Sequence, residues 1–322
     1  MSQPLIIRIL SASVAAANRA GELIREVLRR GNLGLVQKGY DDPQTEADRK
    51  SQRCIVGSLT TRFPGLTVVG EENLDASEED RLLICTGDDE EVLREACPNN
   101  LAALQEKEVV VWVDPLDGTK EFSEGVTEYV TVLVGIAVRG VPVGGVIHQP
   151  FWRPVGTPQS QPPVGRTVWG LVGGSGVKGL QLPDTPPSSS SPARGLTAVV
   201  TLSHYCNLTD MSVKSVSPST LLRAGGAGYK MLMVIEGRAD VYFNPSAGTK
   251  KWDTCAGDAI LRALRPSPGI LTDLVGNPLV YTSEKSNYKN RGFVVTLNEG
   301  VHSEVMSKLP EAVKSSLNPM AV

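Results

Sequence analysis

The feature that most constrains the fold is an apolar run that leads directly into two aspartates. Residues 109–113 are β-branched or aromatic, which is typical of a buried strand. Pro115 cannot donate to a strand ladder and disfavours helix at Asp114, so we expect the strand to end there. Gly118 permits a tight turn. The sequence therefore predicts two carboxylates, Asp114 and Asp117, at the end of a buried strand.

This acidic segment has two interpretations. Asp, Pro and Gly are ordinary turn formers, so a plain turn explains residues 114–118 when they are taken alone. Alternatively, carboxylates together with backbone carbonyls form an oxygen-only ligand set, which suits Mg²⁺, Mn²⁺ or Ca²⁺ rather than zinc. The choice depends on the other acidic residues of the chain.

Composition excludes several classes of protein. The 322 residues suffice for one large domain or two smaller ones. A formal charge of −3 lacks the basic footprint of a dedicated nucleic-acid binder. No apolar stretch reaches the ~20 residues of a membrane span, and no secretory signal is evident. We expect neither nucleic acid nor a membrane as a partner.

The cysteines do not form a recognisable framework. They are five in number, an odd count, and none forms a CxxC pair: Cys54, Cys85, Cys97, Cys206 and Cys255. A disulfide framework or zinc cluster is therefore not expected. Scattered reduced cysteines fit a cytoplasmic protein.

Hydrophobic spacing predicts a mixed α/β chain of two domains, 1–155 and 156–322, with the boundary in a Pro-, Gln- and Gly-rich loop. The first half is expected to hold a helix over 5–30, a polar turn at 39–43, a helix over 45–62 capped by Thr45, a strand over 66–69, an acidic loop and helix over 75–95, and a hairpin of strands 129–138 and 141–148. The second half is expected to hold strands over 167–172, 197–202 and 239–243, helices over 225–236 and 250–264, and a Pro/Ser loop over 183–195.

Three further acidic residues also lie at the end of a predicted strand or at the start of a predicted helix. Glu71 follows the 66–69 strand, Asp253 begins a predicted helix, and Asp48 lies in the first turn of another. A structural role is open for each one: an acidic side chain stabilises a helix N-terminus by ~0.3–1 kcal/mol, and Glu71 could be a solvated loop charge.

Taken together, these segments resemble a known superfamily. Gly70-Glu71-Glu72, Trp112–Thr119 and Trp252–Ala256, in this order, are similar to the lithium-sensitive, Mg²⁺-dependent phosphomonoesterases, which include inositol monophosphatases and fructose-1,6-bisphosphatases. Within it, residues 42–49, 111–121, 165–170 and 250–255 most resemble the 3′(2′),5′-bisphosphate nucleotidases. The resemblance implies a mixed α+β fold, a layered α-β-α-β-α sandwich.

The resemblance also implies roles for the acidic residues. Two to three Mg²⁺ ions would be held by four carboxylates and one backbone carbonyl: Glu71, Asp114, Leu116, Asp117 and Asp253. Thr119 and Asp48 would orient and deprotonate the attacking water, since a carboxylate that accepts the hydroxyl hydrogen leaves the oxygen lone pair free to face water. Li⁺ would inhibit.

Substrate recognition rests on other residues. By the same resemblance, the nucleotide would be contacted by Gly118, Thr119, Thr201, Ser203, His204, Gly226 and Lys230. A glycine-rich turn permits close approach of a phosphate, and a lysine supplies a point charge. An ordinary packing turn is the alternative for residues 225–228. Tyr229 departs from the asparagine expected of the family.

The expected function is Mg²⁺-dependent removal of the 3′-phosphate from adenosine 3′,5′-bisphosphate, and from its sulfated precursor, by a cytoplasmic protein with a small-molecule substrate and, as the favoured state, a monomer. One alternative is an inositol polyphosphate 1-phosphatase. Another is a catalytically inactive nucleotide- or metal-binding regulator, against which the presence of Asp48, Thr119 and all five metal positions argues.

Overall fold

The computed structural model describes residues 3–39, 42–74, 81–158, 160–180 and 195–315. Its helices are α1 (Leu5–Arg30), α2 (Glu46–Arg62), α3 (Glu90–Leu93), α4 (Thr119–Ser123), α5 (Asn207–Val216), α6 (Ala227–Ile235), α7 (Lys251–Ala263), α8 (Glu299–Lys308) and α9 (Glu311–Ser315). Its strands are β1 (Val36–Gly39), β2 (Asp42–Gln44), β3 (Thr67–Gly70), β4 (Val109–Asp117), β5 (Thr131–Val138), β6 (Val141–Gln149), β7 (Arg166–Leu171), β8 (Gly176–Lys178), β9 (Thr197–Thr201), β10 (Thr220–Ala224), β11 (Val241–Asn244), β12 (Ile270–Thr272) and β13 (Phe293–Thr296).

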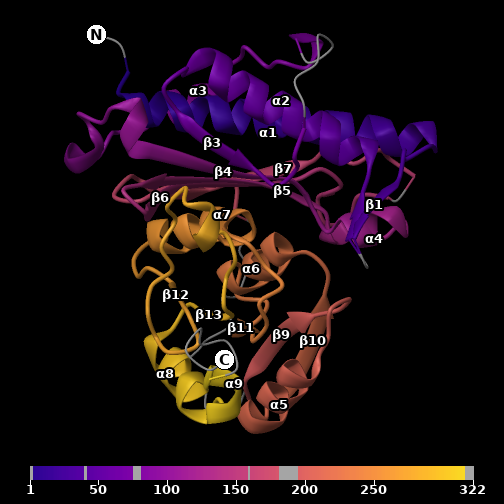
Figure 1. Ribbon diagram of the computed structural model, residues 1–322, viewed down its shortest axis with the longest axis vertical. Coiled ribbons are helices and arrows are strands. Elements are labelled where there is room, and N and C mark those ends of the chain that lie inside the picture. Colours follow the sequence, from indigo (N-terminus) through magenta and orange to yellow (C-terminus); the bar gives the residue numbers. More distant parts are fainter. Residues whose placement is uncertain (1–2, 40–41, 75–80, 159, 181–194, 316–322) are drawn as a thin grey trace.

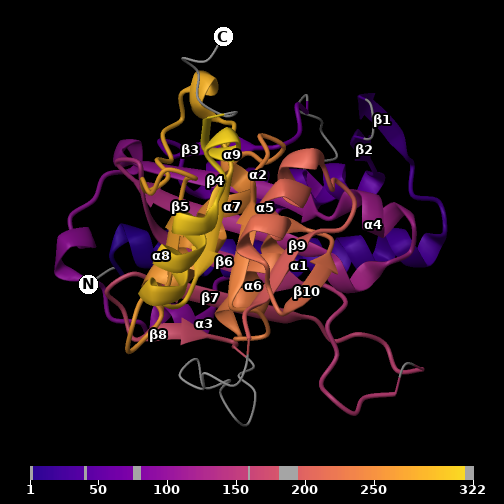
Figure 2. The same cartoon turned by 90° about the horizontal axis from the view of Figure 1, so that it is seen from below.

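The elements stack in five layers, α-β-α-β-α, which confirms the predicted fold class (Figure 1). Helices α1 and α2 cover one face of a six-stranded sheet of order β3-β4-β5-β6-β7-β8. Helices α6 and α7 lie between that sheet and a five-stranded sheet of order β10-β9-β11-β13-β12. Helices α5, α8 and α9 cover the outer face of the second sheet, as the view from below also shows (Figure 2).

The core explains the continuous apolar runs in the central strands. All eight residues of β5 are buried, because α1 packs on one face of the sheet and α7 on the other. Strands covered on both faces carry apolar side chains at every position rather than in alternation. Both long predicted helices and the β5–β6 hairpin are confirmed, and Thr45 caps α2.

Strand β4 corrects one prediction, because it does not end at Asp114 but continues to Asp117. Asp114 pairs with Leu133 and Asp117 with Thr131, so β4 has one more residue than its partner across this step. The extra residue forms a bulge, where Pro115 needs no ladder hydrogen bond. The bulge places both carboxylates at the carboxyl end of β4.

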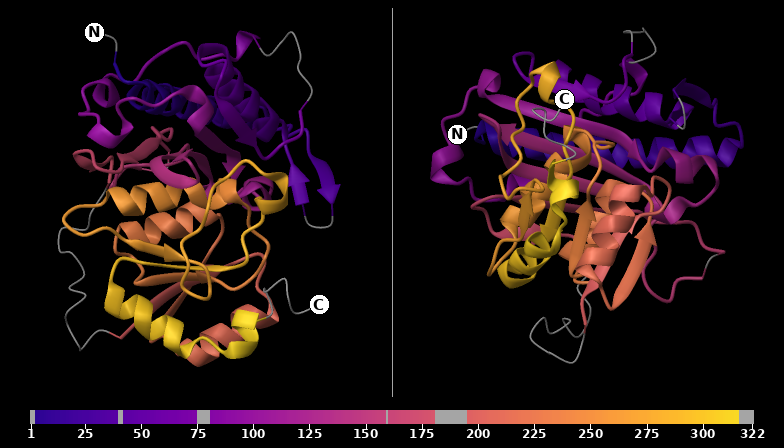
Figure 3. Two further views of the ribbon diagram at one scale, coloured as in Figure 1. Left: turned by 60° about the vertical axis from the view of Figure 1, so that its left-hand side comes forward. Right: turned by 60° about the horizontal axis from the view of Figure 1, so that its bottom comes forward.

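Other segments also differ from prediction. Residues 36–39 and 42–44 form an antiparallel pair, where only a polar turn was expected (Figure 3). Strands β7 and β8 complete the first sheet, so we propose to divide the chain after Lys178 rather than near residue 155. Most of the predicted Pro/Ser loop lies outside the described residues, and so does part of the acidic segment 75–95.

A buried histidine joins α1 to this sheet. His148 on β6 is 4% exposed, and its Nδ1 lies 2.8 Å from the Thr167 hydroxyl. That hydroxyl donates to Asn18, so it accepts from Nδ1–H and leaves the Nε2 lone pair buried without a partner. A Cβ on Gly21 would lie 2.1 Å from Nε2, so α1 can pack this closely on His148 only because residue 21 is a glycine.

We predict that this histidine makes the free energy of unfolding depend on pH. Burial lowers the pKa of His148 to about 3, below the unfolded value of about 6.5, so the unfolded chain binds the proton first. Stability should therefore fall as the pH drops below about 6.5, by up to about 1.4 kcal/mol per pH unit. Urea unfolding of wild type and His148→Gln at pH 7.5 and 5.5, without Mg²⁺, measures this. An equal pH dependence in both proteins would contradict it.

Candidate metal and phosphate site

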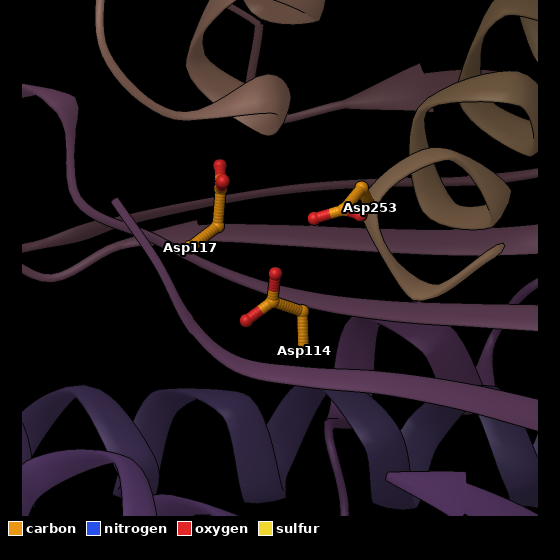
Figure 4. Close-up of side chains that lie close together, drawn as sticks. All are labelled: Asp114, Asp117 and Asp253. Atoms are coloured by element: carbon orange, nitrogen blue, oxygen red, sulfur yellow. The ribbon is translucent and has the colours of Figure 1, made fainter. Parts of the chain in front are cut away.

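Three carboxylates from two distant parts of the chain converge between the first sheet and α7. Asp114 and Asp117 come from the end of β4, and Asp253 comes from the first turn of α7 (Figure 4). One oxygen of each lies within 4.8 Å of the others. An all-oxygen group at this spacing is the donor set that hard divalent cations prefer.

The electrostatics of this group favour a cation. Burial, together with the negative charges of Glu71, Asp117 and Asp253, raises the pKa of Asp114 well above its ordinary value. Burial and the charge of Asp117 raise the pKa of Asp253 to about 6. Because each carboxylate resists ionisation beside its neighbours, a divalent cation is the group that would relieve the repulsion. The residues therefore fit Mg²⁺.

Asp117 also accepts three hydrogen bonds within the protein. Its carboxylate accepts the backbone N–H groups of Ala227 and Gly228 and the Thr131 hydroxyl, each at 2.8 Å. The first two donors are at the start of α6, so Asp117 caps a helix that belongs to the other side of the site. Gly226 enters this turn at φ 59°, and a Cβ there would lie 2.8 Å from Asp117. The predicted glycine turn thus packs directly on a predicted metal ligand.

Glu71 lies on the wall of the same cavity but has a different neighbour. Its carboxylate pairs with the Lys38 ammonium at 3.2 Å, and Lys38 also contacts Glu72 at 2.8 Å. Burial raises the pKa of Glu71 to about 8, and the lysine opposes that shift. The β1–β2 hairpin, which the sequence did not predict, therefore brings a cation to a predicted metal ligand.

Thr119 links the bulge to α2. Its hydroxyl lies 2.9 Å from Asp48 Oδ1 and 2.9 Å from the Leu116 carbonyl. Asp48 is fully buried and holds its other oxygen 2.6 Å from the Thr45 hydroxyl. Burial raises the pKa of Asp48 to about 6, although the hydrogen bonds from both threonines oppose this. The two residues predicted to act on water are thus in contact. Asp48 also accepts the Thr45 backbone N–H and so helps to cap the N-terminus of α2.

A cavity of about 410 Å³ opens over these residues. Nine predicted residues line it: Glu71, Asp117, Gly118, Thr119, Thr201, His204, Gly226, Lys230 and Asp253. Asp48, Asp114, Leu116 and Ser203 are not among its lining residues. Sequence reasoning missed other parts of the wall: Asp42, Pro43, Lys120, Glu121, Cys206, Asn244, Ser246 and Thr249. Asp42, Pro43, Lys120 and Glu121 lie within segments that carry the family resemblance, but sequence reasoning offered no ground for assigning them to the site.

The nucleotide-recognition candidates have defined partners. Lys230 is 3% exposed, and its ammonium donates to the carbonyls of Ala224 at 3.2 Å and Gly226 at 2.5 Å. Burial lowers the pKa of Lys230 to about 8, while Asp117 opposes the shift. Thr201 accepts the His204 backbone N–H at 3.3 Å, and Ser203 donates to Glu121. In this structure, the hydrogen bonds of Lys230 stabilise the backbone of the glycine turn at residues 225–228.

Comparison with known proteins gives a consistent result. Residues 7–314 match the profile of the inositol monophosphatase family. A human protein named 3′(2′),5′-bisphosphate nucleotidase 1 is 40% identical, with 99% of each chain covered. The Dictyostelium discoideum protein of the same name is 37% identical, covering 92% of this chain and 96% of that one.

Solved structures agree on the fold. An inositol monophosphatase (IMPase) from Thermotoga maritima superposes with a TM-score of 0.65 at 19% identity, covering 95% of this chain and 98% of that one. The resemblance deduced from the motifs is therefore confirmed. The chain belongs to the inositol monophosphatase family.

Proposed function

We propose that this chain is a Mg²⁺-dependent phosphatase that removes the 3′-phosphate of adenosine 3′,5′-bisphosphate, giving AMP and phosphate. The observation that carries the proposal is one cavity lined both by Asp117 and Asp253 of the three-carboxylate group and by Thr119, whose hydroxyl contacts Asp48. The substrate follows from the nucleotidase relatives of 40% and 37% identity, which are matched over nearly their whole length.

The residues divide the work between cation binding and proton transfer. Asp114, Asp117 and Asp253, with Glu71 and the Leu116 carbonyl, would hold two to three Mg²⁺ ions. When bound, Mg²⁺ neutralises phosphate charge and lowers the pKa of a water. The Thr119 hydroxyl donates to Asp48, which leaves its lone pair to orient water towards the phosphorus. As the water attacks, it gives a proton to the Thr119 oxygen, and the Thr119 hydroxyl proton passes along this hydrogen bond to the ionised Asp48.

The glycine turn and its neighbours are proposed to hold the nucleotide. Thr201, His204 and Gly226 line the cavity, and the Lys230 ammonium, which donates to the Gly226 carbonyl, supplies positive charge beside them. The sulfated 3′-phosphonucleotide is a second expected substrate. Cytoplasmic location and a monomeric state remain predictions from the sequence. Among the described helices, none combines the length and the apolarity needed to cross a bilayer.

The decisive experiment is a phosphate-release assay with Mg²⁺ on a panel of substrates. Adenosine 3′,5′-bisphosphate is expected to be hydrolysed fastest, ahead of inositol 1,4-bisphosphate, inositol 1-phosphate and fructose 1,6-bisphosphate. Preference for inositol 1,4-bisphosphate would instead support an inositol polyphosphate 1-phosphatase. Release from no substrate would support an inactive binding protein.

Millimolar Li⁺ is expected to inhibit the reaction, as the family resemblance implies. The measurement is the initial rate on adenosine 3′,5′-bisphosphate at fixed Mg²⁺ with added LiCl. The same concentrations of NaCl and KCl control for ionic strength, which screens charge interactions equally for all three salts. Identical rates in the three salts would argue against this sensitivity.

A further inference from the structure

Glu121 is a buried carboxylate that has no part in the reaction proposed above. It lies on α4, two residues after Thr119, and is 5% exposed. The Ser203 hydroxyl donates to its Oε1. A Cβ on Gly225 would lie 2.5–2.7 Å from three atoms of its side chain. The Glu121 side chain, on the helix that follows β4, thus contacts two separate loops of the second sheet.

These two loops form the nucleotide side of the cavity. Ser203 follows β9, and Gly225 follows β10. The two strands are parallel, with Thr201 paired to Ala224, so their carboxyl ends meet at the same edge of the sheet. Thr201, at the end of β9, lines the cavity together with His204 and Gly226 from these loops. The position of Glu121 therefore bears on the spacing of the residues that would contact a nucleoside.

The contacts of Glu121 with Ser203 and Gly225 restrict the movement of both loops. A hydrogen bond to a carboxylate is roughly twice as strong as one between neutral groups. The absence of a side chain at Gly225 lets the backbone turn rest directly against the glutamate carbons, so neither loop can shift inward without displacing Glu121. Glu121 is also outside the group Asp114, Asp117 and Asp253.

We propose that Glu121 is a positioning residue for substrate binding. Through Ser203 and Gly225 it holds the loops after β9 and β10 at the separation that accepts the nucleoside part of a nucleotide bisphosphate. The inference rests on the proposed function, because it names a determinant of that function's substrate binding. We expect the metal group and the Thr119–Asp48 pair to stay in place without it, because Asp117 keeps its hydrogen bonds from Ala227, Gly228 and Thr131 and Thr119 keeps its contact with Asp48.

The test compares variants of the full-length protein by steady-state kinetics on adenosine 3′,5′-bisphosphate and by calorimetric titration with Mg²⁺ alone. Glu121→Ala should raise KM about tenfold or more, while kcat stays within about threefold and the Kd for Mg²⁺ is unchanged. Glu121→Gln should remain near wild type, because the amide oxygen still accepts from Ser203. Glu124→Ala, an exposed glutamate at the end of the same helix, is the matched control.

Ser203→Ala provides an independent variant, since it removes the same hydrogen bond from a less buried side chain. The double variant Glu121→Ala/Ser203→Ala should raise KM little beyond the larger single effect, because both changes break one interaction. The inference is overturned if Glu121→Gln is as impaired as Glu121→Ala, if kcat or Mg²⁺ binding falls instead of KM rising, or if KM is unchanged in both single variants. No hydrolysis of the nucleotide by wild type would contradict the proposed function itself.

Discussion

Asp114→Asn is expected to lower kcat/KM by at least about 10³-fold while leaving the metal-free protein as stable as wild type or more so. Asp114 is 2% exposed, and the charges of Glu71, Asp117 and Asp253 act against its ionised form. Asparagine has nearly the same shape and removes one of these like charges. The substitution should therefore lower the repulsion within the group and, with it, the affinity for a divalent cation.

Thermal unfolding with and without Mg²⁺ separates these two effects. A ligand that binds only the folded state raises its stability, so Mg²⁺ should raise the melting temperature of wild type. It should raise that of Asp114→Asn much less, although the metal-free variant melts at the same temperature or higher. Asp210→Asn, which removes a surface carboxylate paired with Lys214, controls for the change in net charge. An unchanged response to Mg²⁺ in Asp114→Asn would refute the assignment of Asp114 to the cation site.

Thr119→Val is expected to lower kcat by about 10²–10⁴-fold with little change in KM. Valine matches threonine in shape but lacks the hydroxyl that connects Asp48 to the cavity at 2.9 Å. Thr119→Ser keeps the hydroxyl and should retain most of the activity, which makes it the matched control. A Thr119→Val protein with normal kcat would show that the hydroxyl does not act on the water.

The same pair predicts an acid limit to activity. Only the ionised Asp48 leaves an acceptor for the Thr119 proton, and burial raises its pKa to about 6. The wild-type rate should therefore fall as the pH drops towards and below about 6; bound cations nearby favour the ionised form and move this limit lower. A rate that stays constant from pH 7 to pH 4 would contradict this role for Asp48.

Local sequence signals predicted the elements that carry the site. The apolar period of α1, the Thr45 cap of α2 and the Arg139-Gly140 turn of the hairpin each depend on residues close together in the chain. Strands β12 and β13 and helices α8 and α9 were not predicted. Such short segments are defined by their packing on the second sheet rather than by their own periodicity.

By itself, the sequence determined which residue types could bind a cation and, through the order of three motifs, the family and its layered fold. It could not determine that Asp117 caps α6, that Lys38 pairs with Glu71, or that Glu121 contacts the loops after β9 and β10. These relations join residues far apart in the chain. They exist only once β4, α4 and α6 are packed together, because burial and side-chain contact are properties of the tertiary structure.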